Sequence, residues 1–275
     1  MKAVAILLVW AALWSANVRL ARSRTGAWLA PALFGLTLLI LWEGIVRLFD
    51  VPTVILPAPS QIAGAVADNL PILFADFVQT VLKGALTGWL IGCGAGVLAA
   101  LLVARSEFLR RGLLPVGNFV AALPIVGTAP ILVMWFGFGW ESKAAVVVVM
   151  VFFPVLVNTV AGLADTGAMQ RDLMRTYGAA AGQELRYLRI PSALPFIFNG
   201  LKIATTLALI GAIVAEFFGS PTQGMGFRIS TEVGRLNLPM VWATIVVAAL
   251  AGSLSYGAVA LLERWLTFWH PSQRR

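Results

Sequence analysis

The sequence is built from blocks of apolar residues that are long enough to cross a lipid bilayer as helices. Of the 275 residues, 60% are hydrophobic and 12% are charged, whereas soluble domains average about 25% charged residues. Several blocks reach the ~20 residues that a helix needs to span a hydrocarbon core of ~30 Å. The strict alternation over ~10 residues that is typical of a membrane β-strand is missing. The blocks therefore predict an all-α polytopic membrane protein.

Six blocks predict core transmembrane helices, and a shorter seventh stretch lies at the N-terminus. The six predicted spans cover residues 27–49, 81–103, 113–135, 144–163, 201–218 and 240–262. No small-residue cleavage pattern separates residues 3–18 from the arginines that follow, so we favour an extra uncleaved helix, or one lying in the interface, over a signal peptide. The expected parts are this helix with its basic linker (1–26), a transmembrane domain (27–270) and a C-terminal tail (271–275).

The distribution of basic residues predicts the orientation of the spans. The connection 50–79 contains no Lys or Arg, whereas the loop 164–200 contains four arginines, and basic and non-basic connections alternate along the chain. By the positive-inside rule, the N-terminal linker, the loop 164–200 and the C-terminus lie in the cytoplasm. Arg228 and Arg235 conflict mildly with this assignment because the segment that holds them should be external. The same rule accounts for the net charge of +8 without nucleic-acid binding.

Cysteine and histidine are too rare for several kinds of site. The chain has one Cys and one His, which excludes a disulfide framework and argues against a Cys/His metal site. No set of nucleophile, base and acid is visible. We therefore expect neither a catalytic residue nor a metal site in this chain.

The connection 57–79 is too long for a simple turn. After Pro59, apolar residues recur near helical spacing, which predicts an amphipathic helix lying on the outer membrane interface. Pro71 should kink or split this helix.

Glycine recurs every fourth residue in the second predicted span. Small residues at this spacing line one face of a helix and allow a second helix to approach closely in lipid. The face is either a fixed contact within the subunit or a surface that slides during a conformational cycle. The glycines of this helix-packing stripe are Gly84, Gly88, Gly92 and Gly96.

Prolines interrupt the third predicted span at Pro115, Pro124 and Pro130. Non-helical backbone at membrane depth is tolerated only against protein or a wet cavity, and broken helices often flank transport paths. The span is therefore either part of a translocation path or a kinked structural helix.

Few polar side chains fall inside the predicted spans, and buried polar groups in a membrane tend to mark function. Glu43 and Glu216 lie near span ends, where a cap or an interface anchor is an equally good interpretation. The candidates for a translocation path are Asn118, Thr128, Asn158, Thr159, Thr205 and Glu216.

The loop 164–200 is the most informative segment of the sequence. Residues 172–177 predict a short helix that Gly178 should break, and residues 183–190 predict a second short helix that Pro191 should stop. A disordered loop would be richer in Ser, Glu and Lys. We therefore expect a compact basic surface that fits a groove on a partner protein.

This loop resembles the "EAA" motif of ABC importer permeases, E-A-A-x3-G-x9-I-x-L-P. Gly178 takes the position of the motif glycine, and Pro191 that of the motif proline. Asp172, Leu173 and Met174 depart from the usual E-A-A, so only the acid is kept. Further strings, from I-L-P-A-P-S-Q-I to A-E-F-F-G…G-M-G-F, are similar in order to the nitrate/sulfonate/taurine branch of the family over about residues 55–227.

The resemblance implies a type I ABC importer permease fold in a bacterial inner membrane. Two permease copies, as a homodimer, would form the pore, a pair of ATP-binding subunits would sit on the cytoplasmic side, and a periplasmic solute-binding protein would deliver the solute. The chain has no G-x4-G-K-[ST] phosphate loop, so ATP and Mg²⁺ are expected in the partner ATPase and no cofactor is expected here. The motif implies that the coupling residues are Asp172, Arg175, Thr176, Gly178, Ala179, Ala180, Gly182 and Pro191.

The residues alone leave two other classes open. An ion-coupled secondary transporter would carry buried carboxylates or unwound ion sites, usually in repeated halves, and no internal repeat is visible. A membrane enzyme would need clustered His, Asp or Glu. The resemblance further implies a solute of the sulfonate, taurine, nitrate or vitamin-precursor class, whose identity is set mostly by the binding protein.

Overall fold

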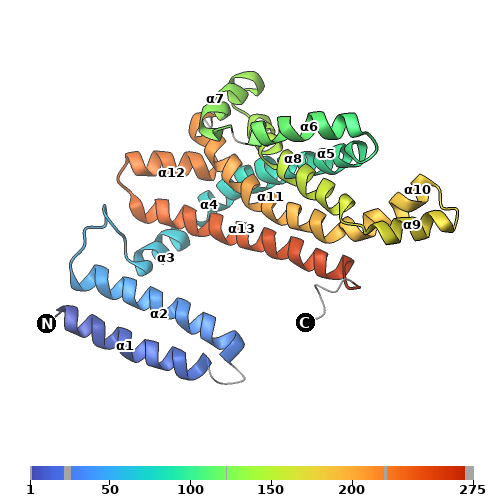
Figure 1. The fold of residues 1–275 in the computed structure, drawn as a ribbon. Coiled ribbons are helices and arrows are strands. Elements are labelled where there is room, and N and C mark those ends of the chain that lie inside the picture. The colour runs from blue at the N-terminus through green and yellow to red at the C-terminus, as the bar shows by residue number, and fades with distance from the viewer. Residues whose placement is uncertain (1, 22–25, 122, 220–221, 270–275) are drawn as a thin grey trace. The chain divides into compact units, whose positions relative to one another are not determined.

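The structure, a computed structural model, describes residues 2–21, 26–121, 123–219 and 222–269, and the regular elements in these ranges are all helices (Figure 1). The chain divides into two compact units. Unit 1 comprises residues 1–73 and 229–246, and unit 2 comprises residues 74–228 and 247–275. Three helices contribute residues to both units, namely α4 (Leu70–Phe77), α12 (Met225–Gly234) and α13 (Leu238–Leu266).

Unit 1 contains an N-terminal pair of helices, α1 (Lys2–Ala21) and α2 (Gly26–Leu48), which lie side by side (Figure 1). Asn17 Nδ2 donates a buried hydrogen bond of 3.1 Å to Thr37 Oγ1. Hydrogen bonds between apolar helices help to hold them together in lipid. The N-terminal stretch is therefore a full helix of 20 residues, three residues longer at its C-terminal end than the sequence predicts.

The end of α2 holds the start of α3 (Pro59–Asp68), also in unit 1. The Glu43 carboxylate accepts hydrogen bonds from the Ser60 backbone N–H at 3.0 Å and from Ser60 Oγ at 2.8 Å, and it forms an ion pair with Arg47. A carboxylate at the first turn of a helix satisfies free N–H groups and complements the helix dipole. Glu43 thus caps α3, one of the two roles that its position near a span end suggests.

The split expected near Pro71 in the helix over residues 57–79 is confirmed, since α3 and α4 are separate helices, but the second half is not a separate amphipathic helix. α3 ends at Asp68, and Leu70 begins a helix that continues through η1 (Val78–Leu86) and α5 (Thr87–Val103). Pro71 lies in the first turn of this helix, where a missing N–H leaves no hydrogen bond unmade. The proline therefore helps to begin the second span, which runs over 34 residues from Leu70 to Val103.

The core of unit 2 is α8 (Trp140–Ala164), which packs against both α5 and α11 (Ile190–Gly219) (Figure 1). Val147, Val151 and Val155 of α8 are fully buried and belong to one cluster with Cys93 of α5 and Ala208 of α11. Burial of these aliphatic side chains between three apolar helices fixes the helices by van der Waals packing.

The glycine stripe faces α8 along its whole length. A Cβ atom at Gly88 would lie 2.7 Å from the Ala144 carbonyl oxygen, and one at Gly92 would lie 3.0 Å from Val148 Cα. Backbone atoms cannot turn aside as a flexible side chain can, so α5 approaches α8 this closely because the stripe has no side chains.

We expect Gly88→Val to destabilise the packing of α5 on α8 by about 3 kcal/mol, because the added methyl groups meet the backbone of α8. The measurement is the thermal unfolding midpoint of the protein purified in detergent. Gly94→Val is the matched control, since Gly94 lies on the same helix with nothing within 4 Å of its Cβ position. Equal midpoints for the two variants would contradict the close approach.

The predicted third span is two helices, α6 (Glu107–Ala121) and α7 (Ile125–Phe136). The backbone is extended at Pro124, with φ −67° and ψ 115°, so the predicted interruption at Pro124 is confirmed. The interruptions predicted at Pro115 and Pro130 are wrong, because both prolines lie inside helices. A proline removes one hydrogen bond from a membrane helix, and neighbouring groups can compensate for that loss.

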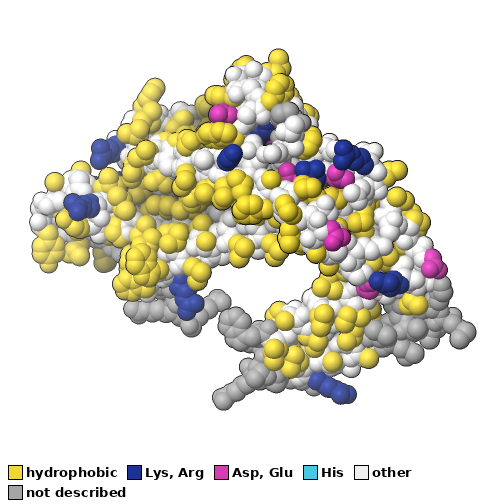
Figure 2. All heavy atoms as spheres, turned by 180° about the vertical axis from the view of Figure 1, so that it is seen from behind, with side chains coloured by type: hydrophobic (Ala, Val, Ile, Leu, Met, Phe, Trp, Pro, Cys, Tyr) yellow, Lys and Arg dark blue, Asp and Glu magenta, His cyan; other side chains and the backbone are white. Residues whose placement is uncertain are grey.

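The described residues contain five helices that are long and apolar enough to cross a membrane, namely Leu29–Leu48, Leu70–Val103, Trp140–Ala164, Ala181–Gly219 and Leu238–Leu266. α7 is a shorter apolar helix, and with α6 it takes the place of the broken third span. Figure 2 shows hydrophobic side chains spread over much of one face, with charged side chains in small scattered groups. The predicted all-α membrane fold is confirmed.

Candidate functional site

Five polar residues meet at one end of unit 2, and we call them the Glu216 cluster. They are Asp76 of α4, Thr80 of η1, Lys143 of α8, Glu216 of α11 and Arg228 of α12. Asp76, Thr80, Lys143 and Glu216 are at most 2% exposed. Ionisable groups buried at this depth are costly unless they are paired and hydrogen-bonded, so their partners define what the cluster does.

Glu216 binds the turn that precedes α12. Its carboxylate accepts hydrogen bonds from the Gly226 backbone N–H at 2.7 Å and from Thr80 Oγ1 at 2.8 Å. Thr80 Oγ1 in turn accepts a hydrogen bond of 2.7 Å from the Met225 backbone N–H. The first free N–H groups of α12 therefore end on Glu216 and Thr80, which ties α12 to both η1 and α11.

Asp76 holds the same turn from a second position. Its Oδ1 accepts a hydrogen bond of 2.8 Å from the Gly224 backbone N–H, and its Oδ2 accepts one of 2.8 Å from Arg228 Nε. The Arg228–Asp76 ion pair has a fully buried carboxylate and a guanidinium side chain that is 16% exposed. Charge-assisted hydrogen bonds of this kind are about twice as strong as neutral ones.

Lys143 completes the charge balance of the cluster. Its Nζ donates a hydrogen bond of 2.8 Å to the Phe138 carbonyl and a second one to the Gly219 carbonyl. Two carboxylates are thus accompanied by two cations in a small buried volume, which limits the cost of desolvation. The arrangement is suited to fixing the connection between α11 and α12.

Both arginines of the segment 219–239 are paired with carboxylates. Arg228 forms an ion pair with Asp76, and Arg235 forms an ion pair of 3.1 Å with Glu232. The positive-inside rule counts Lys and Arg whether or not they are paired, so the mild conflict over this segment stands.

The six translocation candidates do not form a single site. Glu216 lies in the cluster described above, Thr128 donates to the carbonyl of Ile125 in its own helix at 3.3 Å, and Thr205 donates to that of Lys202 at 2.7 Å. Asn118 lies in α6, and its side chain is outside the described part of the structure.

Thr159 and Asn158 differ in their surroundings. Thr159 is fully buried in α8, and its Oγ1 has no hydrogen-bond partner among the described residues. Asn158 Nδ2 donates to the Pro154 carbonyl at 2.8 Å, and Asn158 Oδ1 accepts a hydrogen bond of 3.0 Å from Asn199 Nδ2 of α11. Asn199 is exposed, so an amide pair lies at the surface where α8 meets α11.

Thr205 lines a largely apolar groove of about 360 Å³ in unit 2. Its walls come from η1, α5, α11 and α13, and include Trp89, Leu209 and Ser255. Thr205 and Ser255 are the hydroxyl side chains in this lining.

The loop 164–200 folds as the predicted pair of short helices, with different bounds. They are α9 (Ala168–Thr176) and α10 (Ala181–Glu184), and α10 continues into η2 (Leu185–Arg189). Gln170 and Gln183 cap the two helices by accepting backbone N–H groups of Gly167 at 3.2 Å and Ala180 at 2.8 Å. Each glutamine thus satisfies a backbone N–H at the start of its helix, which helps to explain why the helix begins there.

Gly178 is the turn between the two helices. Its φ of +71° lies in the left-handed region, and the Ala179 N–H donates to the Met174 carbonyl at 3.0 Å while the Gly178 N–H donates to the Arg175 carbonyl at 2.9 Å. This is the usual way in which a glycine ends a helix and satisfies its last carbonyls. The predicted break at Gly178 is confirmed.

The prediction that Pro191 stops the second short helix is wrong. Pro191 lies near the start of α11, and Ala181–Gly219 forms one helix of 39 residues. The wider π-helical turn of η2 directly precedes this proline and leaves room where its ring would otherwise meet a carbonyl. Arg189 Nε also donates a hydrogen bond of 3.0 Å to the Leu163 carbonyl, which fixes η2 to the end of α8.

The remaining coupling candidates lie on the exposed surface of this segment. Asp172 and Arg175 form an ion pair of 3.6 Å with both side chains 71% exposed, and Thr176 Oγ1 donates to the Asp172 carbonyl at 2.9 Å. Ala180 and Gly182 are also exposed, whereas Ala179 is half-buried. Large apolar side chains accompany them, since Met169 is 86% exposed and Tyr177 is 83% exposed.

Sequence reasoning found Glu216 but missed its partners. Asp76 and Thr80 precede the predicted second span, and Lys143 precedes the predicted fourth, so none of them counts as a polar residue within a span. A carboxylate inside a span requires a partner, so Glu216 itself indicated that other polar residues must lie close to it. Which partner it finds depends on how the helices pack, and the spacing of residues along the chain does not show that.

Known proteins match the chain over most of its length. Residues 92–268 match the family described as binding-protein-dependent transport system inner membrane component. The chain is 35% identical over 245 residues to the formylaminopyrimidine transport permease protein of Halalkalibacterium halodurans, a match that covers 89% of this chain and 97% of the relative. It is 32% identical over 236 residues to the riboflavin transport system permease protein of Chloroflexus aurantiacus, covering 86% and 88% of the two chains.

A third relative comes from the sulfonate branch that the sequence motifs resemble. The putative aliphatic sulfonates transport permease protein of Bacillus subtilis is 29% identical over 253 residues, covering 91% of each chain. The family match and these relatives are consistent with the two structural features that predicted a permease, namely the apolar membrane-spanning helices and the helical loop after α8. This chain therefore belongs to the family of binding-protein-dependent inner membrane transport components, the permeases of ABC transporters.

Proposed function

We propose that the chain is the permease of an ATP-driven importer and that a pair of ATP-binding subunits docks on α9 and α10. The exposed apolar side chains of this short two-helix segment are the observation that carries the proposal. Met169, Leu173 and Tyr177 are 86%, 57% and 83% exposed on a segment that also carries exposed charges. Such a compact surface with apolar centre and charged rim is suited to a protein partner.

The connection of this segment to the spans supports a role in coupling. α10, η2 and α11 form one continuous helix from Ala181 to Gly219, and Glu216 lies near its far end. Force applied to α10 by a docked subunit would therefore be transmitted along a single helix to the Glu216 cluster. ATP and Mg²⁺ would be bound by the partner, and the loop and the C-terminus would face the cytoplasm.

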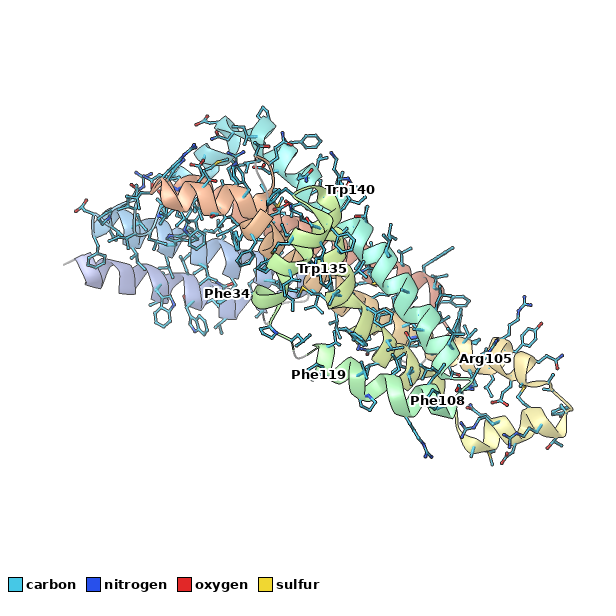
Figure 3. All side chains as sticks on the ribbon, turned by 90° about the horizontal axis from the view of Figure 1, so that it is seen from above. Phe34, Arg105, Phe108, Phe119, Trp135 and Trp140 are labelled. Carbon is cyan, nitrogen blue, oxygen red and sulfur yellow. The ribbon has the colours of Figure 1, made fainter. Side chains whose placement is uncertain are left out.

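A second copy of the chain would complete the pore as a homodimer. Exposed aromatic side chains on α6 and α7 support this pairing, since Phe108, Phe119 and Trp135 are 84%, 68% and 75% exposed (Figure 3). The translocation path would run along unit 2 beside Asn158 and Asn199, which offer hydrogen-bonding groups on an otherwise apolar surface. Asn118, Thr128, Thr159 and Thr205 remain candidates for the same path.

The names of the relatives support a solute class. Their names refer to a formylaminopyrimidine, riboflavin and aliphatic sulfonates. We propose a small polar solute of the vitamin-precursor or sulfonate class, delivered by a periplasmic binding protein. The family assignment favours this role over an ion-coupled carrier.

The proposal is tested by co-expression with a candidate ATPase subunit from the same organism, followed by affinity purification of the tagged permease. The expected result is co-purification of the ATPase, and its loss on Tyr177→Asp, which places a charge on the exposed apolar surface. The control is Leu236→Asp, which places the same charge on an exposed apolar residue in the connection between α12 and α13, outside the spans. Failure of the unaltered chain to retain the ATPase would refute the proposal.

We expect Asn199→Leu to lower solute uptake about five-fold, the equivalent of ~1 kcal/mol for one hydrogen bond. The protein should remain folded, because Asn199 is exposed and, among the described residues, its side chain bonds to Asn158 alone. Ile203→Leu is the control, because Ile203 lies one turn further along α11 and is 43% exposed. Uptake that is equal in both variants would place the path elsewhere.

A further inference from the structure

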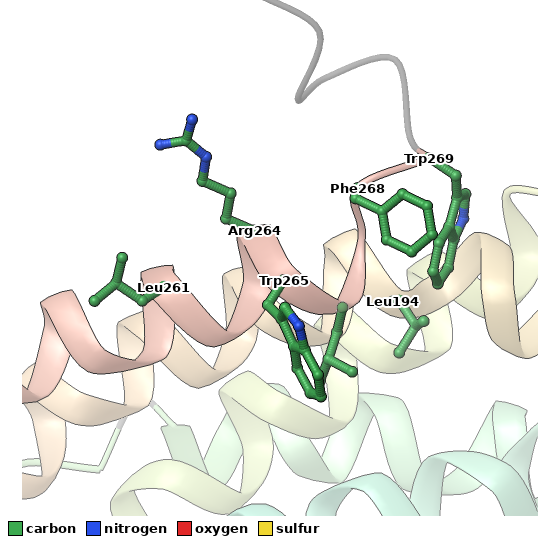
Figure 4. A pocket seen from close by; sticks show the side chains of 7 residues that line it. Leu194, Leu261, Arg264, Trp265, Phe268 and Trp269 are labelled. Atoms are coloured by element: carbon green, nitrogen blue, oxygen red, sulfur yellow. The ribbon is translucent and has the colours of Figure 1, made fainter.

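An open pocket of about 660 Å³ lies at the end of α13, in unit 2 (Figure 4). Leu194 of α11 forms part of its wall, and the rest comes from the last turns of α13 and the residues after it, namely Leu261, Arg264, Trp265, Leu266, Phe268 and Trp269. We propose that this pocket binds an anionic phospholipid, with an acyl chain on the apolar wall and the phosphate on Arg264.

The apolar wall has the composition of a membrane interface. Trp265 is 74% exposed and Phe268 is 71% exposed, and the rings of Phe268 and Trp269 meet edge to face with centroids 5.0 Å apart (Figure 4). Tryptophan is enriched at the level of the lipid headgroups, where one part of its ring is apolar and the other is wet. The end of α13 therefore lies at the depth in the bilayer where the lipid headgroups meet the acyl chains.

Arg264 supplies the one charged group among the described residues of the pocket lining. It is exposed, and among the described residues it has no hydrogen-bond or ion-pair partner. A guanidinium group binds phosphate oxygens through two parallel hydrogen bonds. Since no acidic residue is among the described residues that line the pocket, the wall favours an anion with an apolar tail over a cation or a zwitterion.

Neighbouring contacts hold the walls of the pocket in place. Lys202 of α11 and Glu263 of α13 form an ion pair of 2.8 Å, with side chains that are 19% and 12% exposed. Thr267 Oγ1 and the Thr267 N–H both donate to the Glu263 carbonyl, at 2.7 and 2.8 Å. These contacts fix the last turn of α13 against α11, so that the pocket is part of the fold.

A polar, water-soluble solute would find few hydrogen-bond partners in this pocket, because most of its lining is aliphatic or aromatic. Basic pockets between transmembrane helices on the cytoplasmic side are typical binding sites for anionic headgroups. Leu194 lies three residues after Pro191, where the α9–α10 segment joins α11. A bound lipid would therefore stabilise the junction between the docking segment and the spans.

The test is native mass spectrometry of the full-length permease in detergent, titrated with phosphatidylglycerol or with phosphatidylcholine that carries the same acyl chains. We expect preferential binding of phosphatidylglycerol and, in Arg264→Gln, a loss of about five-fold in affinity, since one basic residue near the surface contributes roughly this much. Arg105→Gln is the control, because Arg105 is exposed after α5 and lies outside the pocket.

Three results would overturn the proposal. The first is equal affinity for the two lipids. The second is an Arg264→Gln variant that binds phosphatidylglycerol with the same affinity as the unaltered chain. Arg264 would then only stabilise the C-terminal end of α13 through the helix dipole. The third is an equal loss in Arg105→Gln, which would show general attraction of basic residues to anionic lipid. Trp265→Leu should also weaken the binding of phosphatidylglycerol. Full affinity in this variant would exclude a role of the apolar wall in binding the acyl chain.

Discussion

Glu216→Ala is expected to lower the stability of the folded protein by about 3–5 kcal/mol, because it leaves buried polar groups without partners. The Gly226 N–H and Thr80 Oγ1 would lose their acceptor, and the charge of Lys143 would no longer be balanced by Glu216. Because whole proteins are stable by only about 5–15 kcal/mol, the variant should fail to accumulate as monodisperse protein. The measurement is size-exclusion chromatography of the solubilised protein with its thermal unfolding midpoint.

Glu141→Ala is the matched control for this prediction. Glu141 lies in the first turn of α8, near Lys143 in sequence, but it is exposed. Its loss should change the midpoint little, since surface substitutions are usually within about 0.5 kcal/mol. A Glu216→Ala protein as stable as Glu141→Ala would mean that the cluster does not hold α12 in place.

The second large effect is expected from Gly178→Val. A φ of +71° is a strained conformation for a β-branched residue, so the turn between α9 and α10 should change shape. The spans do not depend on this turn, and the Gly178 Cβ position has nothing within 4 Å. We therefore expect normal membrane insertion with loss of solute uptake and of solute-stimulated ATP hydrolysis.

Gly178→Asn separates backbone shape from side-chain size. Asparagine adopts the left-handed conformation more readily than other residues with side chains, so this variant should retain most of the uptake that Gly178→Val loses. The comparison is made in proteoliposomes that contain the complete transporter. Normal uptake by Gly178→Val would argue strongly against a coupling role for the segment.

Features that depend on local chemistry could be predicted from the sequence. The apolar blocks predicted the spans, and Gly178 predicted the end of α9, because both depend on the preferences of neighbouring residues. The family resemblance also followed from short strings, and the matching family confirms it.

Features that depend on tertiary packing could not be predicted in the same way. Pro71 and Pro191 both looked like helix breakers, yet neither ends a helix. Pro71 lies in the first turn of α4, where a proline is tolerated, and Pro191 lies inside the continuous helix Ala181–Gly219, just after the π-helical turn of η2. The partners of Glu216 come from segments as far as 136 residues away along the chain. Helical periodicity shows which face of a helix is apolar, and it does not show which polar groups meet across the fold.

The most direct test of the account is a cross-link between Tyr177 and the ATPase subunit. Cys93 is the one cysteine of the chain, and it is buried, so Cys93→Ala with Tyr177→Cys provides a single reactive thiol on α9–α10. We predict that a short reagent with a maleimide at one end and a photoreactive group at the other joins this thiol to the ATPase subunit in membranes, and that an impermeant maleimide reaches it only from the cytoplasmic side. Labelling from the external side, or a complex that retains the ATPase without this cross-link, would contradict the account.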